Sequence, residues 1–259
     1  MKISKKLISA IVMLTLSFVM LVTSSFAWFA MNDTVTAKGM QVTAKADQIY
    51  LQILKGKDQT FAPNLAQNTV TDEENNAVYV PTNVCASIDE SAGTVVKYTS
   101  GTDYVWVTAN SNDPTQSGYV GMKYRKVDDA KLTTSYAYKT DYTLRLDPSA
   151  GGTNSNKLWA SVSLQDTYTD DKIANCVSVL IKCGNQIMLF KQASTDVNAL
   201  KLTEVGNQYL TTEAFPDDGT TVNVEVYVFF DGDNKNCTTQ NVTDASYKVD
   251  VEFSVLAKA

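Results

Sequence analysis

The stretch VNVEVYVFF, residues 222–230, decides the fold class of this chain. Its even-numbered positions are apolar from Val222 to Phe230, whereas Asn223 and Glu225 face the other way in an extended backbone. Apolar and polar side chains that alternate with period two indicate a β-strand with one buried and one wet face. The stretch 246–255 alternates in the same way. Its apolar residues are Tyr247, Val249, Val251, Phe253 and Val255.

Further strands are indicated along the rest of the chain. Period-two runs occur at 40–44, 49–53, 136–146, 158–164 and 177–183. The polar turn formers DGDNKNCTTQNVTD separate the two C-terminal strands, and similar loops separate the others. Many short strands joined by loops predict an all-β protein, an antiparallel jelly-roll-like β-sandwich. Residues 87–130 are rich in Ser, Thr, Asp, Gly and Tyr. We expect them to form an elaboration inserted into one sandwich domain spanning 28–259.

The N-terminus has the features of a signal peptide. Three lysines lie within the first six residues, an apolar run follows from 7 to 22, and Ser25-Phe26-Ala27 has the small-x-small pattern of a cleavage site. We therefore expect a cleavable hydrophobic helix at 1–27, a signal peptidase as partner during export, and a secreted or cell-surface protein. The alternative is a retained anchor, because the run could approach the roughly 20 apolar residues that span a bilayer. Membrane contact is expected only through the uncleaved leader.

Charge and composition narrow the function classes. The net charge is −6, and removal of the three leader lysines leaves the mature part near −9, so nucleic acid is not an expected partner. The chain contains no histidine, which excludes Ser-His-Asp triads, Cys-His pairs and His-ligated zinc. Carboxylates are plentiful, but no motif singles out a catalytic pair. The sequence predicts a protein that is not an enzyme and needs no cofactor.

The four cysteines are disulfide candidates, because an even number in an exported chain favours bridges. They are Cys85, Cys176, Cys183 and Cys237. Cys176 and Cys183 have opposite parity in one strand and are unsuited to each other, whereas Cys183 could meet Cys237. The pairing stays open, and free thiols or a metal site are the alternatives.

Two ligand hypotheses rest on local composition. Asp231 and Asp233 crowd oxygen ligands into one turn, as a calcium site would, but Lys235 stands where a further ligand belongs and no Glu follows. Simple hairpin chemistry is the alternative. A glycan-binding platform is the second hypothesis, because exposed aromatic rings beside Asp and Asn suit sugar stacking. Its candidate residues are Tyr104, Trp106, Tyr119 and Tyr124.

Several segments resemble one known family. The junction SSFAWFAMNDTVTAKGMQVTAKADQIYLQI, the segments TDYTLRLDPSAGGTNSNKLWASVSL and NCVSVLIKC, and the C-terminal stretch 222–255 resemble the TasA/camelysin family of secreted surface and biofilm-matrix proteins of Gram-positive bacteria. Residues 87–130 have no counterpart in the resemblance. Part of that family is described as metalloendopeptidases, but this chain has no HExxH motif, so that activity is not carried over.

The resemblance implies a jelly-roll-like fold and a structural role in surface fibres or matrix. It also implies self-association, or association with related surface proteins, in which residues 28–38 are donated as a strand to a neighbouring subunit. Phe29, Met31, Val35 and Ala37 share one parity there, interrupted by Asp33. Head-to-tail donation does not close on itself and therefore builds fibres. The alternatives are a disordered lead-in or the domain's own first strand, and, for function, a carbohydrate-binding or adhesive surface module.

Overall fold

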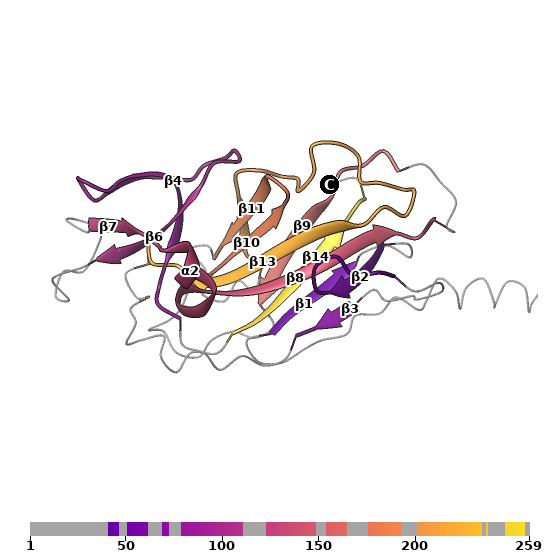
Figure 1. Ribbon diagram of the computed structural model, residues 1–259, viewed down its shortest axis with the longest axis horizontal. Coiled ribbons are helices and arrows are strands. Elements are labelled where there is room, and N and C mark those ends of the chain that lie inside the picture. Colours follow the sequence, from indigo (N-terminus) through magenta and orange to yellow (C-terminus); the bar gives the residue numbers. More distant parts are fainter. Residues whose placement is uncertain are drawn as a thin grey trace, which may run out of the picture. The chain divides into compact units, whose positions relative to one another are not determined.

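The computed structural model describes residues 41–46, 51–61, 69–72, 79–110, 123–148, 154–164, 176–192, 201–234, 237 and 247–256 (Figure 1). The chain divides into two compact units, Met1–Val35 and Thr36–Ala259, and every described residue belongs to the second. The expected signal peptide 1–27 and the donor residues Phe29, Met31, Val35 and Ala37 lie outside the described residues.

The described residues form an all-β body of three sheets. The minor sheet has the strand order β3 (Thr69–Thr71), β1 (Gln41–Ala46), β14 (Lys248–Ser254), β9 (Trp159–Leu164). The major sheet has the order β12 (Thr203–Val205), β11 (Gln186–Lys191), β10 (Val177–Cys183), β13 (Val222–Phe230), β8 (Ala137–Leu146), β2 (Leu51–Lys55). The cap sheet has the order β5 (Thr94–Lys97), β4 (Asn83–Asp89), β6 (Val105–Asn110), β7 (Lys123–Lys126).

A short helix, α2 (Asp129–Lys131), and a π-helical turn (Leu132–Tyr136) lead from the cap sheet into β8. The Asp128 side chain accepts a hydrogen bond from the amide of Ala130 and so caps α2. The helices of the described part are too short and too polar to cross a membrane.

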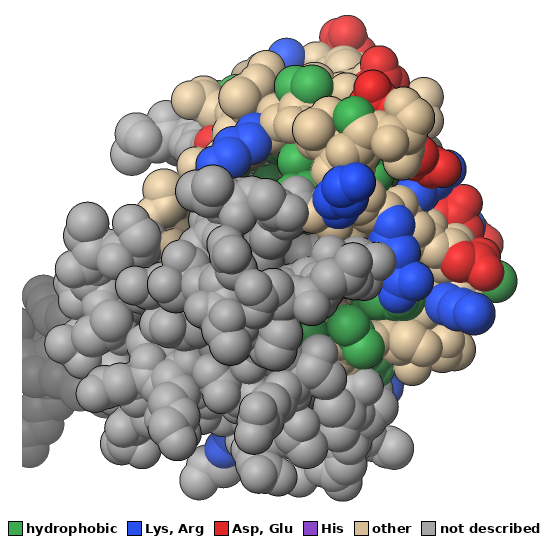
Figure 2. Space-filling model, turned by 90° about the vertical axis from the view of Figure 1, so that its left-hand side faces the viewer, with side chains coloured by type: hydrophobic (Ala, Val, Ile, Leu, Met, Phe, Trp, Pro, Cys, Tyr) green, Lys and Arg blue, Asp and Glu red, His purple; other side chains and the backbone are tan. Residues whose placement is uncertain are grey.

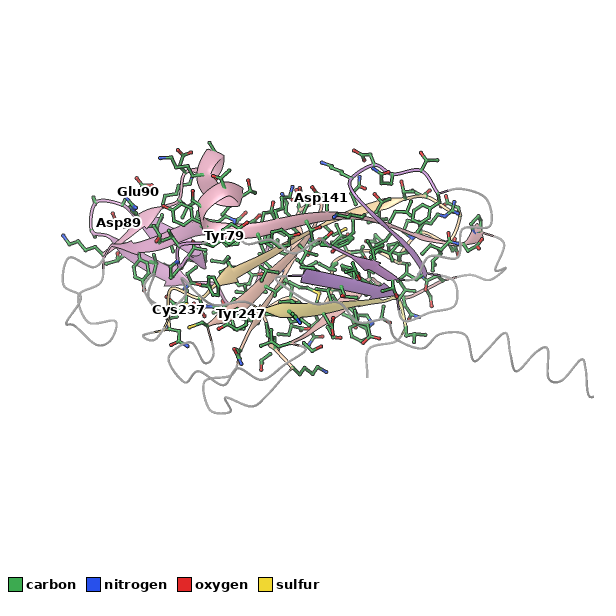
Figure 3. All side chains as sticks on the ribbon, turned by 90° about the horizontal axis from the view of Figure 1, so that it is seen from below. Tyr79, Asp89, Glu90, Asp141, Cys237 and Tyr247 are labelled. Atoms are coloured by element: carbon green, nitrogen blue, oxygen red, sulfur yellow. The ribbon has the colours of Figure 1, made fainter. Side chains whose placement is uncertain are left out.

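The main hydrophobic core lies between the minor and major sheets. Alternate residues of β10, β13 and β14 point into it and are almost fully buried, including Val179, Val226 and Val251. Side chains fill the space between the two sheets (Figure 3). The period-two pattern of the sequence therefore reflects two sheet faces that pack together, as in a β-sandwich. The prediction of an all-β sandwich with mainly antiparallel strands is confirmed at this level.

Tyr142 of β8 brings a polar group into this core. Its side chain is fully buried, and its hydroxyl lies 3.2 Å from both the Val42 carbonyl oxygen and a carboxylate oxygen of Asp72. Lys55 Nζ contacts the other oxygen of Asp72 at 2.8 Å. Burial and the neighbouring Asp72 raise the pKa of Tyr142. A buried hydroxyl is tolerated here because it has a partner.

One strand pair departs from the antiparallel prediction. β1 pairs with β14 in parallel, with Gln41 opposite Lys248 and Ala46 opposite Phe253. Parallel neighbours cannot be joined by a tight hairpin and need a long connection. Here almost the whole domain lies between the two strands, so the connection imposes no antiparallel direction.

The cap sheet covers the other face of the major sheet at one end. Leu180, Ile187, Leu189, Tyr227 and Phe229 of the major sheet form a second buried cluster with residues of the cap sheet. The cap-sheet strands contribute Val84 and Trp106. The expectation of one wet face is therefore wrong for the Tyr227–Phe229 end of β13, because a third layer covers it.

The cap sheet occupies most of the stretch expected as an elaboration at 87–130. It begins at Asn83, before the expected start of the elaboration, and ends at Lys126. At the edge of the sandwich formed by β9 and β12, residues 201–205 pass from the minor sheet to the major sheet. Lys201 bridges to Ser163 of β9, and Thr203–Val205 pair with β11. This segment connects the minor and major sheets at that edge.

Candidate functional site

A polar cluster lies where the cap sheet meets the ends of β11 and β13. Its position depends on main-chain contacts between Thr82, just before β4, and the turn after β13. The Thr82 amide donates to the Phe230 carbonyl oxygen at 2.9 Å, and the Gly232 amide donates to the Thr82 carbonyl oxygen at 2.7 Å. A Cβ at Gly232 would lie 3.3 Å from Thr82 main-chain atoms, so glycine suits this close approach. These contacts hold Asn83 beside Asp231.

The amine of Lys191 is the centre of this cluster, which we call the junction cluster: Asn83, Tyr124, Lys191, Asp231 and Asp233. Lys191 Nζ lies 3.0 Å from Asn83 Oδ1, 3.1 Å from Asp231 Oδ2 and 3.7 Å from Asp233 Oδ2. The Tyr124 hydroxyl donates to Asp233 Oδ1 at 3.1 Å. Four strands or their ends, β4, β7, β11 and β13, thus contribute to one constellation.

Most of these groups have little contact with solvent. Asn83 is 2% exposed, and the side chains of Asp231 and Lys191 are 11% and 23% exposed. Burial raises the pKa of Asp231, although the charge of Lys191 opposes the shift. Burial, followed by the charge of Asp233, raises the pKa of Tyr124. The same two causes raise the pKa of the neighbouring Cys85 thiol to about 12, so this thiol stays protonated.

The turn of the calcium hypothesis is part of the junction cluster. The Asp233 amide donates to Asp231 Oδ1 at 2.9 Å, and the Asn234 amide donates to the Asp231 carbonyl oxygen at 3.0 Å. Both carboxylates face the ammonium of Lys191. The positive charge beside them is therefore that of a lysine. Within the described ranges, no group of three or more His, Cys, Asp or Glu side chains is placed to hold a metal ion. Lys235 lies outside these ranges, and the calcium hypothesis remains untested.

The cysteines are all free thiols in the structure, and all are buried. Cys237 lies beside Cys176: its Sγ is 3.8 Å from the Cys176 carbonyl oxygen, and a hydrogen bond with the Cys176 side chain raises its pKa, as does burial. Cys183 is at the opposite end of β10 from Cys176. The structure therefore brings Cys237 to Cys176, not to Cys183 as the strand parity had suggested.

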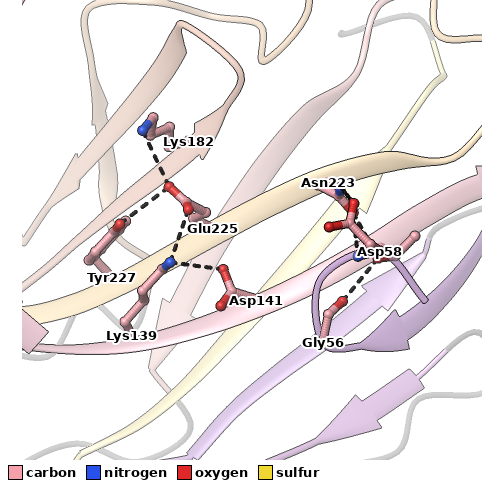
Figure 4. A network of polar contacts seen from close by, with 9 residues as sticks. Gly56, Asp58, Lys139, Asp141, Lys182, Asn223, Glu225 and Tyr227 are labelled. Carbon is pink, nitrogen blue, oxygen red and sulfur yellow. Dashed lines mark hydrogen bonds and ion pairs between the residues drawn. The ribbon is translucent and has the colours of Figure 1, made fainter.

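The uncovered part of the major sheet carries a second polar group, which we call the outer-face network (Figure 4). Lys139 Nζ contacts Glu225 at 2.9 Å and Asp141 at 3.1 Å, and Lys182 Nζ contacts Glu225 at 3.4 Å. The Tyr227 hydroxyl donates to Glu225 at 3.2 Å. Burial alone would raise the pKa of Glu225, but the two lysines outweigh it and lower that pKa.

The proposed glycan platform is not assembled as expected. Trp106 is only 6% exposed, and its ring packs edge-on against Phe229 with the centroids 5.0 Å apart. The candidate Trp106 is therefore a buried ring, because the cap sheet directs it onto the major sheet. Tyr104 and Tyr124 are partly buried, and Tyr119 lies outside the described residues. Glycan binding itself remains untested.

Among the described residues, β5 is an edge strand of the cap sheet, although the Gly93 carbonyl oxygen just before it accepts a hydrogen bond from the Tyr124 amide of β7 at 2.8 Å. β5 has β4 as its neighbour and lies at the end of the strand order. Three of its four residues are exposed, and Val96, at 60%, is the more exposed of the two large hydrophobic side chains exposed in the described part. Figure 2 views the molecule from the left-hand side of Figure 1, where Lys, Arg, Asp and Glu side chains are interspersed with hydrophobic ones. Asp89 and Glu90 lie at the β4–β5 turn (Figure 3).

Comparison of the chain with protein-family models, with curated proteins and with solved structures gives no match in any of the three. The site is therefore interpreted from its own chemistry. The sequence patterns indicated Asp231 and Asp233 as candidate site residues but gave no such indication for Asn83 and Lys191. One signal was present: Lys191 shares the parity of Ile187 and Leu189, so a lysine ends an otherwise apolar strand face.

Proposed function

We propose that this chain is an exported structural component of cell-surface fibres or a biofilm matrix, with a jelly-roll-like sandwich as its body. Export is supported by the basic, apolar and small-residue order of 1–27. The structural role is supported by the resemblance to the TasA/camelysin family and by the absence of histidine from the sequence. In this proposal, residues 28–38 pair with a sheet edge of a neighbouring subunit.

The edge strand β5 is the observation that carries this proposal. An open edge offers unpaired main-chain donors and acceptors, and an extended peptide can add to it as a further strand. The β5 residues Val95 and Val96 are β-branched, and Val96 is largely exposed. Such an edge is an aggregation hazard in a monomer, but it is a binding site in a protein that polymerises.

In the sequence, the donor segment precedes the first described strand of its own subunit. Residues 28–38 are followed closely by β1, which lies between β3 and β14 in the minor sheet. Tension on a donated segment would therefore be transmitted to a central strand. Main-chain hydrogen bonds would supply affinity, and the alternate side chains Phe29, Met31, Val35 and Ala37 would supply register. Because donor and acceptor surfaces differ, the contact repeats and forms a fibre.

The test compares the mature protein that starts at Trp28 with a form that starts at Met40, by negative-stain electron microscopy. We expect fibres from the longer form and monomers from the shorter one. If both forms stay monomeric at all concentrations and salt conditions, the proposal is refuted. A glycan array on the monomer would then test the carbohydrate-binding alternative.

The acceptor edge is tested separately with Val96→Lys, because a lysine on an edge strand disfavours further pairing. Leu256→Lys is the matched control, since Leu256 is also an exposed large hydrophobic residue, at 41%, and lies outside the cap sheet. We expect Val96→Lys to abolish fibres and Leu256→Lys to leave them unchanged. Equal fibre formation by both variants would exclude β5 as the acceptor.

A further inference from the structure

The junction cluster brings together an amine, a carboxamide and a buried carboxyl group from three different parts of the chain. The geometry points to an intramolecular isopeptide bond between Lys191 Nζ and Asn83 Cγ, formed by the folded protein itself with Asp231 as the proton carrier. This inference goes beyond the proposed function and does not depend on polymerisation. It concerns a covalent cross-link between the cap sheet and the major sheet.

Proximity is the first argument. Lys191 Nζ already donates a hydrogen bond to Asn83 Oδ1 at 3.0 Å, and Oδ1 is bonded to the carbon that would be attacked. Groups that a folded protein holds side by side react as if at very high concentration, because the entropy of bringing them together is already lost. The two residues are 108 positions apart in the chain, so only the fold brings them into contact.

The side-chain carbonyl group of Asn83 is also polarised. The amide of Val84 donates to Asn83 Oδ1 at 2.8 Å, in addition to the bond from Lys191. When the amine attacks Cγ, negative charge develops on Oδ1, and a donor that already points at this atom stabilises it. Asn83 is 2% exposed, so water competes little for these hydrogen bonds or for the carbonyl carbon.

Asp231 supplies the acid–base chemistry. Its Oδ2 lies 3.1 Å from Lys191 Nζ, close enough to accept a proton from the ammonium and leave a neutral, nucleophilic amine. Burial raises the pKa of this carboxyl group, which makes the protonated form easier to reach than in water. The protonated Asp231 can then donate to the departing amide nitrogen.

The reaction balances without an oxidant or a cofactor. The bond that forms joins Lys191 Nζ to Asn83 Cγ, and the bond that breaks joins Asn83 Cγ to Nδ2. Nδ2 leaves as ammonia and takes up the proton that Asp231 carried. Overall, one ammonium side chain and one carboxamide give one secondary amide and one ammonium ion.

The placement of the bond has a mechanical consequence. Lys191 ends β11 of the major sheet, and Asn83 begins β4 of the cap sheet. A covalent bond between them would prevent the cap sheet from separating from the sandwich under force or in denaturant. Without it, the two layers are held by the hydrophobic cluster around Trp106 and by main-chain contacts at Thr82.

The test is the intact mass of the full mature chain after folding and complete reduction, followed by mapping of its proteolytic peptides. We expect a deficit equal to one ammonia molecule and a branched peptide that joins Lys191 to Asn83. An unchanged mass, or a deficit of one water molecule mapped to Asp231, would overturn the assignment. This measurement on the unmodified chain needs no variant to fold.

Variants then test the assigned roles. Lys191→Arg and Asn83→Ala should each restore the full mass expected from their sequences, whereas Asp231→Asn should slow the loss of ammonia during refolding at least tenfold. Lys182→Arg is the matched control, because Lys182 is a major-sheet lysine paired with Glu225 outside the junction cluster. It should lose ammonia at the rate of the unmodified chain. Ammonia loss in Lys191→Arg would refute the role of Lys191.

Discussion

Replacement of Trp106 by alanine tests whether the cap sheet is packed onto the sandwich as described. Trp106 is 94% removed from solvent and lies within ring contact of Tyr227 and Phe229, with centroid distances of 5.7 and 5.0 Å. An aromatic side chain buries about 150–250 Å². At about 25 cal/mol per Å², this corresponds to about 4–6 kcal/mol of transfer free energy.

The alanine side chain keeps a small part of this transfer free energy, and the neighbouring side chains can move to fill part of the cavity. Phe or Trp to Ala replacements in cores typically cost about 3–5 kcal/mol, and we expect Trp106→Ala to fall in this range. Because the cap sheet forms its own hydrophobic cluster, the loss should be concentrated there. Amide hydrogen exchange should accelerate in β4 and β6 more than in the sandwich strand β14.

The assay is denaturant unfolding followed by circular dichroism, together with hydrogen exchange on the folded state. Val96→Ala is the control, because this side chain is exposed and its replacement should change the free energy of unfolding by less than about 0.5 kcal/mol. A loss below about 1 kcal/mol for Trp106→Ala, with unchanged exchange in β4 and β6, would refute the packing argument. It would also restore Trp106 as a candidate for an exposed aromatic platform.

Two further predictions concern the outer-face network and the cysteine pair. Because Lys139 and Lys182 lower the folded-state pKa of Glu225, its ion pairs stabilise the protein above the unfolded-state pKa of about 4.3 and lose this effect as pH falls through the lower folded value. Glu225→Gln should thus cost about 1 kcal/mol at pH 7 and progressively less below pH 4 in denaturant unfolding; a pH-independent difference would contradict this. Under a disulfide oxidant such as oxidised glutathione, the contact between Cys176 and Cys237 predicts that these two thiols form a bridge while glutathione is reduced, as shown by non-reducing peptide mapping. A bridge between Cys183 and Cys237 instead would contradict the arrangement in the structure.

The strands were the part of the fold that local patterns predicted best. Residues 222–230 and 177–183 coincide with β13 and β10, because their alternating side chains meet one continuous core. The prediction of a wet face for residues 222–230 failed from Tyr227 onward. Tyr227 and Phe229 are apolar on the face opposite the core, which could have indicated a third layer, but period-two patterning does not reveal which segment covers a face.

The candidate site was less predictable than the fold. Asp231 and Asp233 are close in sequence, and their turn by itself suggests a cation site. The positive charge beside them is the amine of Lys191, from a strand 40 positions earlier. Nothing in the local sequence of Asn83 relates it to either residue. A cluster that is assembled from separate strands has no local signature.

The sequence by itself determined the strand periodicity, the acidic charge, the absence of histidine and the export signal expected at 1–27. Each of these depends on residue type and on neighbours within a few positions. The tertiary structure alone decided the parallel pairing of β1 with β14, the burial of Trp106 and the meeting of Asn83, Lys191 and Asp231. These depend on contacts between residues far apart in the chain, which only the packing of complete sheets brings together.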